Sequence, residues 1–181
     1  MKQLGHTRIG YIANEIDEYP QKERYNAFLN MLDFMELPHR TVWDAVWQRP
    51  RVNGELLMEK DLPDYTSYLE PVMAQPNAPT AFICLDTWRA KCAHVALEKL
   101  GYSVPHDVSL VGARMLKDAF SSDYNSCYYT ALIDHSEQVY CQAVHLLLEQ
   151  MFTPEPHPVL NQLIVPELDL ERSTAPCRNQ K

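Results

Sequence analysis

Glycine is scarce in this sequence, with five residues among 181. None of them falls in a GxGxxG, GxxxxGK(S/T) or GxSxG spacing, and no HExxH is present. Phosphate cradles and nucleophile elbows need glycines at fixed spacing, because the backbone must approach the ligand closely or turn sharply. On motifs alone, an enzyme is therefore the less favoured interpretation.

Positive charge and long apolar runs are scarce too. The 16 Lys and Arg residues are outnumbered by 24 Asp and Glu residues, which gives a net charge of −8. Binding to nucleic-acid phosphates needs clustered Lys and Arg, so we expect no DNA binding by this chain itself. No apolar run is long enough for a membrane-spanning helix, and residues 1–10 lack the apolar core of a signal peptide. The sequence predicts a cytoplasmic protein with no membrane partner.

Cysteine and histidine give no sign of a metal site. The seven histidines include no i, i+4 pair, and the cysteines have no CxxC spacing. We interpret the five cysteines as reduced thiols that mostly serve as packing residues (Cys84, Cys92, Cys127, Cys141 and Cys177). No metal and no other cofactor is expected.

Short apolar runs alternate along the chain with segments of helical periodicity. Strands are expected at 8–13, 41–47, 81–85, 108–111 and 129–133, with one or two more in 159–170. Helices are expected at 21–35, 65–73 with a break near Pro71, 87–100 and 136–151. This alternation predicts an α/β fold with a parallel sheet and right-handed crossovers. Ligands of such sheets bind beyond the carboxyl ends of the strands.

Single residues predict where several elements begin and end. Asp86 can cap the helix that follows it, and Gly101 can end that helix before Pro105 prevents its continuation. Asp134 with Glu137 resembles a capping box at the start of the last helix.

Three polar stretches show no regular pattern. Residues 48–63 read as a loop excursion, and residues 113–127 as irregular structure. The acidic residues Glu15, Asp17 and Glu18 follow the first strand, where they could meet a metal or a hydroxyl-rich ligand. A solvated acidic loop is the preferred interpretation.

Four segments of the chain resemble a known family. They are GHTRIGYIA (5–13), QKERYNAFLNML (21–32), TAFICLDTWRAKCAHVALEKLGYSVPHDVSLVG (80–112) and VPELDLERSTAP (165–176). In this order they are similar to the effector-binding domain of the lactose-repressor/galactose-repressor (LacI/GalR) family. The most specific parts are the GYSVPHDVSLVG junction and the closing RSTAP.

The resemblance implies a type I periplasmic-binding-protein-like fold, which is a Rossmann-like parallel sheet flanked by helices. Residues 1–128 then correspond to the C-terminal lobe, and residues 129–152 to a returning segment that belongs to the N-terminal lobe. Residues 153–181 supply the final strands and the tail. By resemblance, the DNA-binding helix-turn-helix head and most of the first lobe are absent from this chain.

The resemblance also implies effector contacts. Arg24 matches a family arginine that grips ligand hydroxyls or carboxylates, although a surface ion pair is the alternative. Asp86 stands at a ligand-contacting position and could be a contact, a helix cap or both. Arg114 replaces family acids that bind sugar hydroxyls, which favours an anionic ligand such as a sugar phosphate or sugar acid, or a loss of binding.

Two further contacts follow from the same comparison. Asp134 matches a hinge residue that lines the cleft, but a capping role is preferred for it. Trp43 or Trp47 could supply an aromatic platform for a sugar face, with core packing as the alternative.

The resemblance places helix 87–100 at a homodimer interface, where Trp88 or His94 would be exposed. It also assigns the partner of helix 136–151 to the missing lobe. We therefore expect the apolar face of that helix either to dock on another copy or to stay exposed (Val139, Ala143, Leu146, Leu147 and Met151).

Together these features predict the ligand-sensing portion of a LacI/GalR-type regulator. A small, sugar-like effector would control DNA binding by a separate head in a homodimer. The alternatives are a stand-alone solute-binding protein of the same fold and, less favoured, a flavodoxin-like enzyme.

Overall fold

The computed structural model describes residues 1–14, 16, 19–47, 51–52, 55–56, 64–115, 128–152 and 162–178. The interpretations of Glu15, Asp17, Glu18 and Cys127 fall outside the described residues, as does most of the predicted loop 48–63 and of the irregular stretch 113–127.

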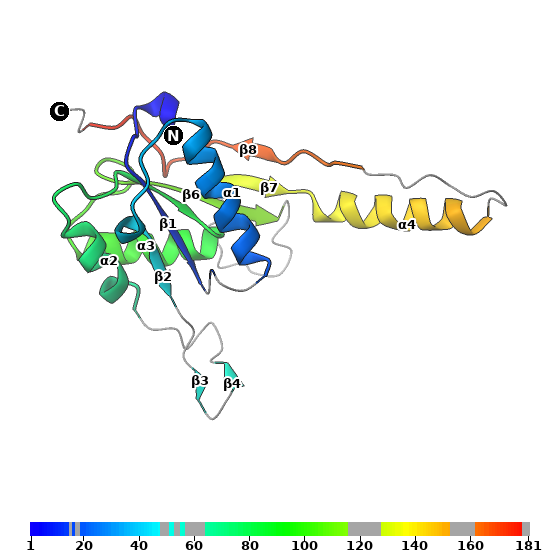
Figure 1. Cartoon of the computed structure of the whole chain (residues 1–181), viewed down its shortest axis with the longest axis horizontal. Helices are drawn as coiled ribbons and strands as arrows, with labels where there is room; N and C mark the ends of the chain where they lie inside the picture. The colour runs from blue at the N-terminus through cyan, green and yellow to red at the C-terminus, as the bar shows by residue number, and fades with distance from the viewer. Residues whose placement is uncertain are drawn as a thin grey trace.

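A six-stranded sheet in the order β2-β1-β5-β6-β7-β8 forms the centre of the molecule (Figure 1). Its first five strands are parallel, and β8 runs antiparallel to β7. The strands are β1 (Ile9–Asn14), β2 (Ala45–Trp47), β5 (Ala81–Cys84), β6 (Ser109–Met115), β7 (Thr130–Asp134) and β8 (Glu167–Asp169). A separate pair comprises β3 (Arg51–Val52) and β4 (Glu55–Leu56). The predicted α/β class with a parallel sheet is confirmed.

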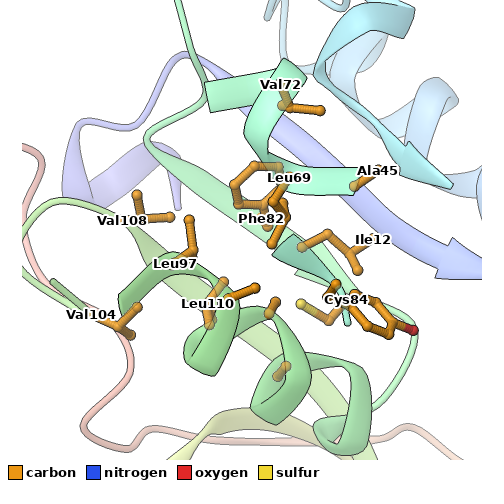
Figure 2. Packing of buried hydrophobic residues seen from close by; sticks show 14 of the residues in the cluster. Ile12, Ala45, Leu69, Val72, Phe82, Cys84, Leu97, Val104, Val108 and Leu110 are labelled. Atoms are coloured by element: carbon orange, nitrogen blue, oxygen red, sulfur yellow. The ribbon is translucent and has the colours of Figure 1, made fainter. Parts of the chain in front are cut away.

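Four helices connect or extend these strands. They are α1 (Gln21–Phe34), α2 (Thr66–Met73), α3 (Thr87–Lys99) and α4 (Ser136–Phe152), with short 3₁₀ turns at Lys2–Leu4 and Thr41–Trp43. Helices α2 and α3 share one apolar core with the sheet, and Figure 2 shows Leu69 of α2 near Phe82 and Leu97 of α3 near Leu110. Helix α1 lies on the opposite face of the sheet (Figure 1). Neighbouring residues of β1 point to opposite sides, so Tyr11 contacts α1 whereas Ile12 enters the core shared with α2 and α3.

The junction GYSVPHDVSLVG connects α3 to β6. Helix α3 begins after Asp86, whose Oδ1 accepts the backbone N–H of Arg89 at 2.8 Å, and Gly101 follows its end with φ of 86°. In β6, a Cβ at Gly112 would lie 2.9 Å from the backbone carbonyl carbon of Asp86 and from the amide nitrogen of Thr87. Only glycine therefore lets β6 pass this close to the start of α3.

The closing RSTAP segment joins β6 and β7 from outside the sheet ladder. Ser173 is fully buried, and its carbonyl accepts the N–H of Leu110 at 2.8 Å. Its hydroxyl donates to the carbonyl of Leu110 at 2.7 Å and accepts the N–H of Thr130 at 2.9 Å. The tail thus satisfies buried backbone groups that would otherwise lack partners.

Some boundaries differ from those expected. Helix α2 continues through Pro71, because burial of its apolar residues against the core outweighs the lost backbone hydrogen bond. Residues 41–47 divide into a 3₁₀ turn and β2, and β6 extends to Met115. Helix α4 begins at Ser136, and the carbonyl of the preceding His135 accepts the N–H of Val139 at 3.1 Å, so the cap expected at Asp134 stays a prediction.

Helix α4 leads away from the sheet, together with the extended segment 162–166 (Figure 1). No residue of α4 is buried. Its large apolar side chains are mostly exposed, as are two in the extended segment (Val139, Tyr140, Val144, Leu147, Leu148, Met151, Phe152, Leu163 and Val165). In this single chain most of the apolar face of α4 is therefore uncovered, and its docking on another copy stays a prediction.

Candidate functional site

The carboxyl ends of the parallel strands meet at one edge of the sheet. Strand β1 ends at Asn14, β5 is followed by Asp86, and β6 ends with Arg114 and Met115. Strand β7 ends at Asp134 beside them, since Met115 and Asp134 are register partners. Three of the predicted site residues are therefore brought to the same edge by the strand order.

A buried polar cluster lies where β1 and β5 end. Arg89, on the first turn of α3, donates from Nε to Asn14 Oδ1 at 3.2 Å and forms an ion pair with Asp86 at 2.5 Å. The hydroxyl of Tyr65 reaches Asn14 Oδ1 at 3.5 Å, and burial raises the pKa of that phenol. The guanidinium is held in a protein interior because a carboxylate and an amide oxygen satisfy it.

Asp86 has two roles in this cluster. One carboxylate oxygen caps α3, which confirms the predicted cap, and the other pairs with Arg89. A ligand contact by Asp86 stays a prediction. Asn14 and Arg89 were not among the residues predicted from the sequence, although an arginine three residues after a capping aspartate is a local signal for an ion pair.

Arg114 is paired within the sheet. Its guanidinium forms an ion pair with Asp169 of β8, whose side chain lies on the same face. The 55 residues that separate these two positions hide the pairing from sequence inspection. Asp169 therefore offsets the positive charge on which the expectation of an anionic ligand depended.

Arg24 is exposed on the first turn of α1. Its charge lowers the pKa of Tyr11, although burial outweighs it and raises that pKa overall. The next residue of the helix, Tyr25, packs on Tyr11 of β1, with the two ring centres 5.3 Å apart. A ligand contact by Arg24 stays a prediction.

The two candidate tryptophans lie at opposite ends of β2. Trp43 precedes the strand, is buried, and has the Arg40 guanidinium 5.6 Å from its ring centre. Trp47 ends the strand and is the register partner of Asn14. Of the two, Trp47 is thus the one at the carboxyl edge, and its indole is also buried.

Asp134 lines a shallow hollow of about 240 Å³ at the junction of the sheet and α4. Most of its lining is apolar (Ala113, Leu132, Asp134, His135, Val139, Ile164 and Pro166). None of Asn14, Asp86 and Arg89 lines this hollow, although Asp134 ends its strand at the same edge of the sheet. Its cleft-lining role stays a prediction.

His94 of α3 belongs to an aromatic group with Tyr128 and Tyr129, which directly precede β7. Its ring stacks on Tyr128 at 5.3 Å, and its Nδ1 hydrogen-bonds the hydroxyl of Tyr129 at 3.0 Å. Nearby on α3, Val95 is 46% exposed. The predicted homodimer interface at this helix is not tested by a single chain.

The described residues hold no group of three His, Cys, Asp or Glu side chains placed to bind a metal ion. Among the same residues, no helix combines the length and the hydropathy needed to cross a bilayer.

Comparison with known proteins connects this architecture to a family. The model of the periplasmic binding protein-like domain matches residues 1–174. The chain belongs to the periplasmic-binding-protein-like domain family. The resemblance to the effector-binding domain of LacI/GalR regulators is thereby confirmed, since relatives and solved structures of this domain carry such names.

The curated relatives of this periplasmic-binding-protein-like domain include transcriptional repressors. The HTH-type transcriptional repressor PurR of Actinobacillus pleuropneumoniae is 28% identical over 149 residues, which cover 81% of this chain and 40% of the repressor. The PurR repressor of Pasteurella multocida is 26% identical over the same shares. This chain thus spans about 40% of the length of these relatives.

Solved structures share the fold. A LacI family transcriptional regulator from Bifidobacterium animalis aligns with a TM-score of 0.70 at 19% identity, covering 97% of this chain and 58% of that one. A LacI family regulator from Enterococcus faecium, with bound ribose, aligns with a TM-score of 0.65 at 19% identity, covering 98% and 60%.

Proposed function

We propose that this chain is the ligand-sensing portion of a LacI/GalR-type transcriptional regulator. The observation that carries the proposal is the gathering of polar side chains at the carboxyl edge of the sheet, above all the Asn14–Arg89–Asp86 cluster. Ligands of open parallel sheets bind at this edge, where strand ends converge. The ligand class is a small, hydroxyl-rich molecule such as a sugar or a sugar-derived acid or phosphate, and Arg24 is its principal contact. No catalytic step belongs to this function.

The proposal includes the division of the chain into lobes. Residues 1–128 form the C-terminal lobe, 129–152 belong to an N-terminal lobe, and 153–181 complete the C-terminal lobe and its tail. The exposed α4 supports this division, because a helix with apolar residues over most of its circumference requires a covering layer. The length of the curated relatives supports it as well.

Regulation then follows from differential binding. An effector that contacts both lobes stabilises the closed arrangement, and this shift of population changes DNA binding by a separate head in a cytoplasmic homodimer. An effector with equal affinity for both arrangements would have no regulatory effect.

The test is ligand-induced stabilisation measured by thermal unfolding. Millimolar D-ribose and a panel of sugars, sugar acids and sugar phosphates are added to the wild-type protein, R24A and K22A. Lys22 is the matched control, because it is an exposed cation on the same turn of α1. We expect a stabilising sugar to raise the Tm of wild type and K22A and to lose this effect in R24A, since ligand binding to the native state adds to stability. An equal rise in R24A contradicts the role of Arg24.

A further inference from the structure

The carboxylate of Asp44 is a buried acceptor that joins three elements. Its side chain is 4% exposed. Oδ1 accepts the backbone N–H of Tyr11 in β1 at 3.0 Å, and Oδ2 accepts the hydroxyl of Tyr25 in α1 at 2.6 Å. Oδ2 also accepts a hydrogen bond from His39 Nε2 at 2.9 Å. Hydrogen bonds to an ionised carboxylate are shorter and stronger than neutral ones, so this junction is well defined.

Helix α1 otherwise has few attachments to the body of the protein. Leu32, near its C-terminal end, is its single buried residue. No side chain caps its N-terminus, where Pro20 occupies the capping position. At the far end, Lys2 Nζ donates to the carbonyl of Met35 at 2.7 Å. Near the first turn of α1, which carries Arg24, Tyr25 and Phe28 contact the body, and Tyr25 adds the hydrogen bond to Asp44.

Tyr25 holds this turn through its ring and its hydroxyl together. The ring centre lies 5.3 Å from that of Tyr11 and 6.2 Å from that of Phe28. The hydroxyl lies against Asp44, and burial together with this carboxylate raises the pKa of the phenol. The ring contacts are non-directional, whereas the hydrogen bond to Asp44 fixes the position of the first turn of α1 relative to β1.

We propose that Asp44 and Tyr25 are positioning residues that place the Arg24 guanidinium for ligand binding. The inference rests on the proposed function, because it assumes Arg24 as the contact. Asp44 holds the Tyr25 hydroxyl, Tyr25 holds the first turn of α1, and that turn carries Arg24 beside β1. Neither positioning residue touches the ligand. Loss of the Tyr25 hydroxyl releases the turn while its ring still packs.

The decisive variant is Tyr25→Phe, which removes one oxygen and keeps the ring. Tyr19→Phe is the matched control, because Tyr19 precedes the same helix and is 82% exposed. The first readout needs no ligand: hydrogen exchange at the amides of residues 24–27. We expect roughly tenfold faster exchange there in Y25F than in wild type or Y19F, with no change in α3. Equal exchange in Y25F and Y19F would overturn the proposal.

The second readout separates positioning from general weakening. D-Ribose affinity is measured by calorimetry for wild type, Y25F, R24A and the double variant. If Tyr25 acts through Arg24, Y25F weakens binding about tenfold in the wild-type background and has no further effect in R24A. A similar additional loss in the R24A background overturns the positioning role.

A third comparison distinguishes this inference from the proposed function. If wild type binds neither D-ribose nor any member of the sugar panel, the proposed function fails, while faster exchange in Y25F still supports the anchoring of α1 by Asp44. Asp44→Asn provides a second variant with the same shape. If D44N folds, as judged by its denaturant midpoint, unchanged exchange at residues 24–27 contradicts the proposal.

Discussion

At the scale of single residues, long-range polar contacts hold the chain ends. His6 is 2% exposed, and its Nε2–H donates to the carbonyl of Ala175 at 3.0 Å. Its Nδ1 accepts the hydroxyl of Thr80, also at 3.0 Å. With Nε2–H donating to a carbonyl, the neutral imidazole leaves Nδ1 as the acceptor, and burial of the ring disfavours the protonated form. The N-terminal segment, the start of β5 and the RSTAP tail therefore meet at a neutral histidine.

This geometry predicts a pH-dependent stability. Burial lowers the pKa of His6 below its ordinary value of 6.5, and the backbone carbonyl of Ala175 only partly opposes this effect. The unfolded chain therefore binds a proton more readily, so the contribution to stability is complete above pH 6.5 and falls as the pH drops from there toward the folded pKa. Urea unfolding of wild type and His6→Gln between pH 5 and 8 measures it. The same slope in both proteins would contradict the prediction.

Sequence inspection could predict contacts between near neighbours but not these distant pairs. The cap by Asp86 was predictable because its partner amide lies three residues away. The acceptors of Arg89 and Arg114 include Asn14 and Asp169, which lie 75 and 55 residues away. Nothing local marks such partners, so the sequence could not show that Arg114 pairs with Asp169, and a ligand contact by Arg114 stays a prediction.

At the scale of elements, the α3–β6 unit shows how sequence signals combine. The cap at Asp86 predicts the start of α3, which the structure confirms, and Gly101 and the apolar run predict the end of α3 and the start of β6 to within one residue. Local signals were weaker elsewhere. Burial of α2 outweighs the helix break expected at Pro71. Pairing with β7 extends β6 to Met115. The end of β6 could not be predicted, because a charged residue such as Arg114 does not indicate a buried strand. Its place in the strand depends on pairing with β7 and on the ion pair with Asp169.

Gly112 provides the prediction at this scale. We expect Gly112→Ala to destabilise the protein by roughly 1–3 kcal/mol, because its Cβ meets the backbone of Asp86 and Thr87 and must displace the start of α3. Gly101→Ala is the comparison, since its Cβ meets open space and only its left-handed φ is strained. Urea unfolding gives both values. If G112A but not G101A speeds hydrogen exchange at the start of α3, the destabilisation arises from the contact with Asp86 and Thr87. Unchanged exchange there in G112A would argue against this close approach.

At the scale of the whole molecule, the chain divides into a packed body and an unpacked extension. The body comprises the sheet with α1, α2 and α3, and the Asn14–Arg89–Asp86 cluster lies at its carboxyl edge. The extension comprises α4 and the segment 162–166, and its apolar surface is exposed. This contrast agrees with a chain that spans about 40% of its curated relatives. The periodicity of α4 does not predict its isolation from the body, because apolar spacing is the same whatever covers it. That expectation came from the family resemblance, which assigns the partner of this helix to another lobe.

The proposed function requires a small hydroxyl-rich ligand to bind at the carboxyl edge of the sheet. Chemical-shift mapping of the isotope-labelled protein during a D-ribose titration locates such a ligand. We expect saturable shifts at Asn14, Arg24 and Asp86, with the resonances of α4 unchanged. Shifts confined to the hollow around His135 and Val139, or to the exposed face of α4, would contradict it.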